Sequence, residues 1–260
     1  MPRTLITLAT YNEIENLPLL VGEIFRFAPE VDILVIDDNS PDGTGRWCDE
    51  AATGEPRLSV LHRTGKLGLG TAILTGMRHA IDRGYDWVLN MDADFSHHPR
   101  HLPALLACRD EPAGGQAVDV MIGSRYVPGG RIEGWGWKRH FMSRSVNTAA
   151  RVLLGLKPRD CSGSYRCYRT RLLADLDFGA IRSRGYSFQE EILFHLARLG
   201  ATMREIPITF VDRQRGQSKI NSGEALAAGR ILVRLGIDRC RRLAPADRNQ
   251  FAGSDKRPGI

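Results

Sequence analysis

The feature that most constrains the fold is the alternation, over the first half of the chain, of short apolar runs with amphipathic stretches. The runs have the length and composition of buried strands, and the stretches carry apolar residues at helical spacing. Strands are expected at residues 5–8, 31–36, 58–61, 87–90 and 118–123, and helices at 15–27, 44–52, 70–83 and 99–108. Such alternation indicates βαβ units, so we expect an α/β fold with a mainly parallel sheet flanked by helices.

A polar cluster follows each expected strand. The clusters, in chain order, are TYNE, DDNSPDGT, HRTGKLGLG, MDAD and GSRY. In open parallel sheets, ligands bind outside the carboxyl ends of the strands, which is where these clusters would lie. The sequence therefore predicts a binding site at that edge of the sheet.

Two of the clusters contain paired carboxylates. Asp92 and Asp94 follow a strand in MDADFSHHP, and both side chains could converge on one ion. Carboxylate oxygens suit Mg²⁺ or Mn²⁺, which often links carboxylates to substrate phosphates, although a loop capping the helix near Pro99 explains the same residues. For Asp37 and Asp38, the alternatives are a contact with a nucleobase or ribose and an Asx-rich turn.

Two basic segments are candidates for phosphate binding. Residues 65–72, GKLGLGTA, place glycines and Lys66 before a helix, where backbone N–H groups can approach a phosphate; helix capping explains them equally. Residues 211–219, VDRQRGQSK, could form a lid over a diphosphate or a solvated basic loop. The net charge of +6 favours anionic partners in general.

Composition and motifs argue against several other classes of protein. No stretch approaches the roughly 20 apolar residues that cross a bilayer, and the early strand leaves no room for a signal peptide. Five scattered cysteines without a CxxC pair favour reduced thiols in a cytoplasmic protein. No nucleic-acid partner is expected, because the sequence has neither an RNP pattern nor a zinc finger, and its basic residues do not lie along one helix.

The segment that follows the fifth expected strand, residues 131–156, mixes aromatic and basic residues. Its later part has an apolar side, formed by Val146, Ala149, Ala150, Leu153 and Leu154. We expect an amphipathic helix that lies in a membrane interface, with Trp135, Trp137 and Phe141 beside it; packing on the sheet is the alternative.

The remainder of the chain has a simpler pattern. A helix is expected at 188–199, a strand at 202–210 and a helix from 223 to about 235. Residues 237–260 lack periodicity and apolar content, which is typical of disorder. We therefore expect a single domain over residues 1–236 and a disordered tail over 237–260.

Eight motifs together occur in an order that resembles family 2 glycosyltransferases. They are TYNE, DDNSPDGT, LGLGTA, MDADFSHHP, GSRY, SGSYRCY, SFQEE and VDRQRGQSK, spread over residues 4–236. Within that family, the chain is most similar to the dolichol-phosphate (polyprenyl-phosphate) mannosyltransferases. The resemblance implies the Rossmann-like GT-A fold and transfer of mannose from GDP-mannose to a polyprenyl phosphate, with inversion.

The resemblance also implies roles for individual residues. The nucleotide sugar would be lined by Ala9, Tyr11, Glu13, Ile36, Asp38, Asp92, Ala93, Asp94, Arg125, Arg213 and Lys219. The metal, Mg²⁺ or Mn²⁺, would be held by Asp92 and Asp94, with Ser96 at a position where some relatives have a glutamine ligand. The catalytic residues would be Asp94, Arg125, Arg213 and Lys219, and the acceptor phosphate would meet Arg131, Lys138, Arg139 and Arg144. Glu190 lies in the region where such enzymes shape the sugar and acceptor side.

The implied chemistry needs no general base. A phosphate monoester is anionic at neutral pH, with a second pKa of about 6, and can attack the sugar directly. The implied partners are GDP-mannose, a polyprenyl phosphate, a membrane surface reached from its cytosolic face, and small membrane-anchoring subunits. The alternatives are a related transferase using another donor, such as UDP-glucose with undecaprenyl phosphate, and a non-catalytic sugar-nucleotide-binding subunit.

Overall fold

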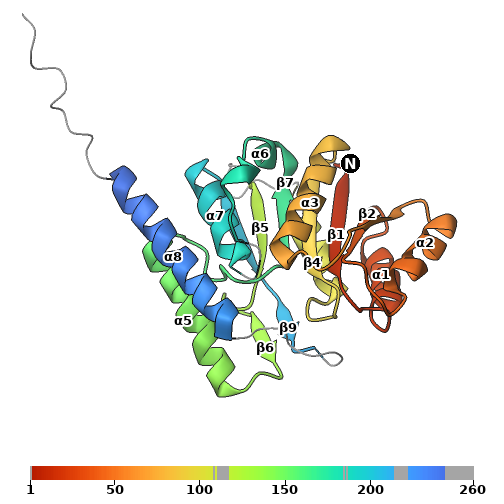
Figure 1. Ribbon diagram of the computed structural model, residues 1–260, viewed down its shortest axis with the longest axis horizontal. Helices are drawn as coiled ribbons and strands as arrows, with labels where there is room; N and C mark the ends of the chain where they lie inside the picture. Colours follow the sequence, from red (N-terminus) through yellow and green to blue (C-terminus); the bar gives the residue numbers. More distant parts are fainter. Residues whose placement is uncertain are drawn as a thin grey trace, which may run out of the picture.

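A seven-stranded sheet forms the centre of the protein, in the strand order β3-β2-β1-β4-β7-β5-β8 (Figure 1). The structure is a computed structural model that describes residues 2–107, 109, 117–183, 185, 187–213 and 222–243. The strands are β1 Thr4–Thr10, β2 Asp32–Asp37, β3 Leu58–His62, β4 Trp87–Asp92, β5 Val120–Ser124, β7 Arg166–Arg169 and β8 Met203–Pro207. All neighbouring pairs are parallel except those of β7, which runs antiparallel to both β4 and β5.

Helices cover both faces of this sheet. They are α1 Leu17–Phe27, α2 Thr44–Gly54, α3 Leu69–Asp82, α4 Leu102–Ala107, α5 Trp137–Leu154, α6 Thr170–Ala174, α7 Phe188–Arg198 and α8 Ser222–Leu243, with short 3-10 turns η1 Pro99–His101 and η2 Phe178–Ala180. Because side chains alternate along a strand, Ile33 and Val35 pack in a core with α1 and α4, whereas Leu34 and Ile36 pack with α3 and α7. The expected α/β fold with a mainly parallel sheet is confirmed.

The strand register brings three of the polar clusters together. Ala9 of β1 is paired with Ile36 of β2 and with Asp92 of β4, and Thr10 is paired with Asp37. Because these strands are parallel, their carboxyl ends lie at one edge of the sheet. The loops with the sequences TYNE, DDNS and DADF are therefore neighbours there, as the sequence predicts.

The antiparallel strand β7 has no counterpart among the expected elements. Its sequence, RCYR, begins with Arg166, whose side chain is fully buried. The guanidinium of Arg166 donates hydrogen bonds to the carbonyls of Gln189 at 2.7 Å and Cys161 at 2.6 Å. A buried arginine is unusual, which explains why the pattern of residues did not indicate a strand.

The strand expected at residues 202–210 is divided in the structure. After β8, the chain leaves the main sheet, and β9 Thr209–Val211 pairs with β6 Arg131–Glu133 in a separate two-stranded sheet. The backbone N–H of Ile208 donates to Ser124 at 3.0 Å, and its carbonyl accepts from Arg131 at 2.9 Å. The basic segment, which begins at residue 211, therefore follows the two-stranded sheet and not the main sheet.

The C-terminal helix is longer than expected. α8 continues to Leu243, so the prediction of a helix that ends near residue 235 and a disordered tail from 237 is wrong for residues 237–243. α8 lies beside α5 (Figure 1), and Arg239 donates to the carbonyls of Val152 at 3.1 Å and Leu153 at 3.3 Å. These contacts satisfy the carbonyls at the end of α5 and hold the last turns of α8. Residues 244–260 lie outside the described part of the chain.

The helix expected after the fifth strand is present as α5, and its place in a membrane interface stays a prediction. Within the described ranges, no helix has both the length and the hydropathy needed to cross a bilayer.

Candidate active site

The carboxyl edge of β1, β2 and β4 contains three residues other than glycine with a positive φ. They are Asn12 at 60°, Asn39 at 59° and Phe95 at 61°, one in each loop that follows these strands. Side chains other than glycine rarely adopt this conformation, and it persists where surrounding contacts enforce it. The three loops are therefore held in defined shapes.

The TYNE and DDNSPDGT loops are joined by hydrogen bonds. Three consecutive backbone N–H groups donate to side chains of the second loop: Asn12 to Ser40 and Glu13 to Thr44, both at 3.0 Å, and Ile14 to Asp42 at 3.1 Å. Burial opposes the ionised carboxylate of Asp42, yet its hydrogen bonds to Thr44 and Ile14 lower its pKa below the ordinary value. Tyr11 and Glu13 are therefore fixed relative to the end of β2.

The two carboxylates at the end of β2 both have protein partners. Asp37 accepts from the hydroxyl of Thr10 at 3.0 Å and from the backbone N–H of Ser40, three residues on, at 3.0 Å, so it holds the turn that follows β2. Asp38 forms a buried ion pair with the guanidinium of Arg63. The turn interpretation holds for Asp37, and the contact of Asp38 with a nucleotide stays a prediction.

The remaining residues expected at the nucleotide lie around the same edge. Ala9 is partly buried and Ala93 is buried between the two aspartates. The side chain of Ile36 is fully buried against α3, so a contact with a ligand would need its main chain. Lys66 lies with its Nζ 5.0 Å from the centre of the Tyr11 ring, which brings the glycine-rich segment to the TYNE loop.

The glycines of GKLGLGTA serve mainly the packing and start of α3. Gly68 precedes the helix with a φ of 102°, which disfavours other residues. A Cβ on Gly70 would lie 2.8 Å from the carbonyl of Ser183 and 3.0 Å from Cβ of Phe188. Helix capping and close packing against α7 account for both positions.

The acidic pair sits at the end of β4 in two different environments. The side chain of Asp92 is one-third exposed (33%) and accepts a hydrogen bond from the hydroxyl of Ser164 at 2.7 Å. Asp94 is buried; one of its oxygens accepts from the backbone N–H of Ser96 at 3.0 Å, and the other lies 3.2 Å from Arg213. The structure thus brings Arg213, the first cation of the basic segment, to the acidic pair, and its contact with donor phosphates stays a prediction. Lys219 lies outside the described residues.

His97, for which the sequence has no distinguishing signal beside His98, holds the acidic loop in place. Its ring stacks on Tyr165 at 5.0 Å and meets Phe210 of β9 edge-on at 5.5 Å. Its Nδ1 accepts from the backbone N–H of Asp92 at 3.3 Å, and burial lowers its pKa despite the nearby Asp92 and Asp94. A neutral, fully packed imidazole positions β4 against β9.

The donor atoms at this edge fit a divalent metal. Asp92 and Asp94 offer hard carboxylate oxygens, and Oγ of Ser96 is buried without a hydrogen-bond partner in the described structure. The described residues contain no cluster of three or more His, Cys, Asp or Glu side chains that could hold a metal, so substrate oxygens and water would complete the coordination. Mg²⁺ is commonly bound in that way.

Arg125, expected at the donor phosphates, is held by a residue that the sequence does not single out. Its guanidinium makes two 2.7 Å contacts with the fully buried carboxylate of Asp160 and donates to Ser162 at 2.8 Å. Although burial opposes both charges, the contact raises the pKa of Arg125 and lowers that of Asp160. This fixes the guanidinium, and its contact with donor phosphates stays a prediction.

The four residues expected at the acceptor phosphate have different surroundings. Arg131 is exposed on β6, and Lys138 is exposed beside the ring of Trp137. Arg139 contacts both oxygens of Asp212, at 2.7 and 2.8 Å. Arg144 lines a cavity with other arginines. The structure does not gather all four around one point.

Glu190 is buried under the sheet edge near Arg166. Burial raises the pKa of its carboxyl to about 7, although its own backbone N–H and Arg166 act in the opposite direction. Its Oε2 and both polar atoms of the Gln189 side chain have no hydrogen-bond partner in the part of the chain that is described. Such buried polar groups are expected where a ligand completes the hydrogen bonding.

Comparisons with known proteins identify the family of this chain. The Glycosyl transferase family 2 model matches residues 6–177. An undecaprenyl-phosphate mannosyltransferase from Micrococcus luteus is 46% identical over 221 residues, covering 85% of this chain and 88% of that protein. A polyprenol monophosphomannose synthase from Mycolicibacterium smegmatis is 46% identical over 220 residues, covering 84% and 81%.

Two solved structures show the same fold at low identity. Glucosyl-3-phosphoglycerate synthase from Mycobacterium tuberculosis, in complex with Mn²⁺, UDP and its product, has a TM-score of 0.64 at 20% identity, covering 92% of this chain and 80% of that one. A mannosyltransferase from Pyrobaculum calidifontis, in complex with GDP-Man and Mn²⁺, has a TM-score of 0.58 at 16% identity, covering 93% and 64%.

Proposed function

Because this chain belongs to glycosyltransferase family 2, we propose that it transfers mannose from GDP-mannose to a polyprenyl phosphate, with inversion at the sugar carbon. Two relatives that are 46% identical over most of their length carry names of that activity. The observation that carries the proposal is the meeting of Asp94 and Arg213, 3.2 Å apart, at the edge where parallel strands end. A carboxylate for a metal and a cation for a diphosphate are thereby placed together.

The donor nucleotide would lie over the TYNE and DDNS loops. Tyr11, Glu13 and Asp38 supply its polar contacts, and Ala9, Ile36 and Ala93 form the strand ends beneath it. The shared hydrogen bonds of the two loops support this placement, because they fix the pocket before the donor arrives. A preformed pocket lowers the entropic cost of binding.

A divalent metal would be held by Asp92 and Asp94, with Ser96 as a possible oxygen donor. When bound, it neutralises charge on the diphosphate as that group departs. Ser164 orients one carboxylate, and the backbone of Ser96 orients the other. These contacts keep both carboxylates in position without the donor.

The acceptor phosphate supplies its own nucleophile. One of its oxygens forms a bond to the anomeric carbon while the bond from that carbon to the diphosphate oxygen breaks, and the electron pair leaves with the nucleoside diphosphate. No proton needs to be removed, so this step does not require a general base. Arg213 and Lys219 would stabilise the departing group, and Arg125, fixed by Asp160, would order the phosphates.

The lipid acceptor would be reached at a membrane surface. Arg131, Lys138 and Arg139 would attract its phosphate, and the side chains of Trp137 and Phe141 are 74% and 71% exposed near them. Exposed aromatic residues beside cations suit the boundary between head groups and acyl chains. We propose a peripheral position on the cytosolic face.

A donor assay tests this proposal. Purified protein is incubated with a short polyprenyl phosphate, Mg²⁺ or Mn²⁺, and either GDP-mannose or UDP-glucose, and the lipid product is separated. We expect a mannosyl lipid from GDP-mannose and about 10²–10³-fold slower product formation by the Asp94→Asn variant. Product from UDP-glucose alone would overturn the mannose assignment, and nucleotide binding without any product would favour a non-catalytic subunit.

A further inference from the structure

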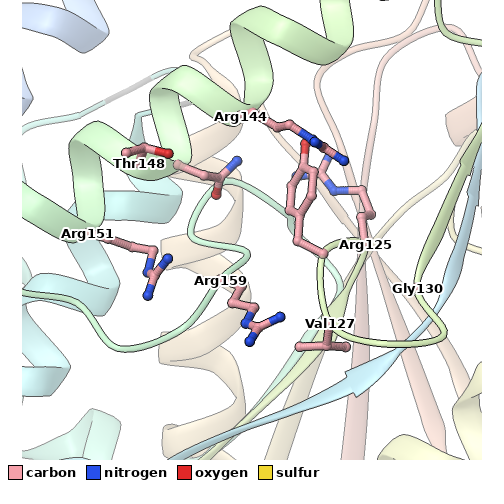
Figure 2. A pocket seen from close by; sticks show the side chains of 9 residues that line it. Arg125, Val127, Gly130, Arg144, Thr148, Arg151 and Arg159 are labelled. Carbon is pink, nitrogen blue, oxygen red and sulfur yellow. The ribbon is translucent and has the colours of Figure 1, made fainter.

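A cavity of about 500 Å³ lies between α5, the turn after β5 and the loop after α5 (Figure 2). Arg144, Thr148 and Arg151 line it from α5, at positions i, i+4 and i+7, which share one side of a helix. Arg159 reaches it from the following loop, and Arg125 lies at its edge. The cavity is therefore lined by four arginines.

Among the described residues, three of these arginines have no compensating charge. Arg125 is paired with Asp160, whereas Arg144, Arg151 and Arg159 have no carboxylate within 4.0 Å among the residues that the structure places. The carboxylate of Glu205 lies near the loop, but it accepts from the backbone N–H groups of residues 159 and 160. Three guanidinium groups around one hollow repel each other, and a bound anion would remove that repulsion.

The shape and charge of the cavity fit a phosphate. Guanidinium groups bind phosphate oxygens through paired N–H donors. Thr148 adds a hydroxyl at the cavity wall, between the two arginines of α5. The backbone that carries these donors belongs to one helix and an anchored loop, so only the exposed side chains have to become ordered when the ligand arrives.

The surface next to the cavity is apolar and exposed. Phe141 and Val152 of α5 are 71% and 69% exposed, on the helix side adjacent to the arginines, and Met142, farther around the helix, is 49% exposed. On the neighbouring α8, Val233 and Ile237 are also exposed, one turn apart. Cations that flank an exposed apolar helix surface are typical of segments that lie on anionic bilayers.

We infer that this cavity binds the phosphate of an anionic phospholipid head group and thereby sets how α5 lies on the bilayer. The cavity lining contains neither the acidic pair nor Arg213, nor any residue of the TYNE or DDNS loops. Two arginines of the lining, Arg125 and Arg144, are also expected at the reaction site, and Arg125 is neutralised by Asp160. Arg151 and Arg159 are not among the residues expected there. The inference does not depend on which sugar is transferred.

The test compares the Arg151→Ala/Arg159→Ala protein with a control of equal charge, Arg46→Ala/Arg171→Ala, whose arginines are exposed on α2 and α6. Binding to phosphatidylcholine vesicles, with or without phosphatidylglycerol, is measured by flotation. We expect the first variant to lose about tenfold or more of its affinity for the anionic vesicles. Equal losses in both variants would overturn the inference, as would no loss in either.

A second comparison separates a defined site from diffuse charge. The Arg151→Lys/Arg159→Lys protein keeps both charges but cannot form the paired N–H contacts of guanidinium. Affinity well below that of the wild type supports the cavity. Full recovery of vesicle binding by the lysines would show that charge alone suffices and would overturn the site.

Two further arms identify the source of the phosphate. In calorimetry, water-soluble short-chain phosphatidylglycerol should bind to the wild type more tightly than inorganic phosphate, and the Arg151→Ala/Arg159→Ala change should remove the difference. Tighter binding of inorganic phosphate would assign the cavity to the free ion.

The second arm is kinetic and uses no vesicles. In the Arg151→Ala/Arg159→Ala variant, KM for a short, soluble polyprenyl phosphate should equal that of the wild type. A rise in KM would instead make the cavity the acceptor site. If the wild-type protein showed no transfer of mannose, the proposed function would be overturned, but the vesicle-binding result would still stand.

Discussion

The edge of β1, β2 and β4 differs from the arginine-lined side of α5 in whether its charged side chains have partners of opposite charge. At the edge, Asp37, Asp38 and Asp42 all have partners within the protein. On α5, Arg144 and Arg151 point into a cavity and have no acidic partner in the described ranges. Most charged side chains of the first region are therefore compensated within the protein, whereas those of the second region are not.

The difference indicates how each region would meet a ligand. A network whose members are all satisfied is rigid, and it can present a few groups, here Asp92 and Asp94, at defined positions. Uncompensated cations on a helix instead repel each other, and binding of an anion lowers their electrostatic energy. The edge is suited to chemistry on a small substrate, and the α5 side is suited to capture of a charged surface.

Removing Asp160 should have the largest effect on stability. The Asp160→Ala change leaves Arg125 buried and unpaired, which costs about 3–5 kcal/mol in the free energy of unfolding. Urea denaturation measures this loss. The matched control is Asp49→Ala, which removes an exposed partner of His62 and should cost less than about 0.5 kcal/mol. Similar losses in both variants would show that burial does not increase the contribution of the Arg125–Asp160 pair to stability.

Changing Asp94 should affect turnover rather than folding. Asp94→Asn keeps the hydrogen bond from Ser96 but removes the charge, so turnover should fall by about 10²–10³-fold. Asp37→Asn provides the contrast, because Asp37 serves a turn and its change should lower stability more than turnover. Rates with GDP-mannose and denaturation curves are compared for both. Unchanged turnover in Asp94→Asn would remove this residue from the reaction.

Glu190 should make stability depend on pH. Its pKa is about 7, whereas an unfolded glutamate has an ordinary value of 4.5. Between these values the folded state holds a proton that the unfolded state has lost, so wild-type stability should fall by about 1.4 kcal/mol per unit as pH rises. Glu190→Gln should lack this slope, as measured by urea denaturation across pH.

The neighbouring Glu191 is the control for this pH effect. Burial alone would raise its pKa, but the nearby imidazole of His195 and hydrogen bonds from the backbone N–H groups of Ser183 and Arg182 lower it. Its contribution to stability is present above the unfolded pKa and is lost as pH falls, so Glu191→Gln should be most destabilising near neutral pH. The same pH trend for both variants would contradict the assignment.

Removing the Ser164 hydroxyl should loosen one metal ligand. Ser164→Ala takes away the 2.7 Å hydrogen bond to Asp92, and loss of such an orienting contact lowers metal affinity by about tenfold. Paramagnetic resonance of Mn²⁺ with GDP present measures affinity independently of turnover. Ser59→Ala, on β3, is the control and should leave Mn²⁺ binding unchanged. Unaltered Mn²⁺ affinity in Ser164→Ala would mean that Asp92 does not need this contact.

The smallest effect on folding is expected at the exposed surface of α5. Phe141→Ser should change the free energy of unfolding by less than about 0.5 kcal/mol, because the ring is largely exposed and contributes little to the core. The same change should weaken vesicle binding. Leu105→Ser, at a fully buried position, is the contrast and should be strongly destabilising. A large loss of stability in Phe141→Ser would show that the ring packs against the protein.

Much of the fold follows from local pattern. Strands and helices of the first half lie within a few residues of their expected ranges, because alternation and helical spacing reflect burial on faces that the chain itself defines. The pattern failed at β7, where Arg166 is buried against backbone carbonyls contributed by other segments. It also failed at α8, whose final turns depend on α5.

The candidate site was predictable where a residue's role depends on its position at a strand end. Asp92, Asp94 and Asp38 are of this kind, and the motif order added Arg213. The residues that hold the site were not predictable: Asp160 is 35 positions from Arg125, and Ser164 is 72 positions from Asp92. Nothing in either local segment indicates its partner.

The sequence by itself therefore determined the order of strands and helices in the first half of the chain, the edge at which ligands would bind, and the carboxylates placed there. Only the tertiary structure decided which charges are compensated, at Arg125 and Asp38, and which remain open, at Arg144, Arg151 and Arg159. The physical reason is that burial periodicity is a property of neighbouring residues, whereas the energy of a charge depends on the distance in space to its partner and on the water excluded around both.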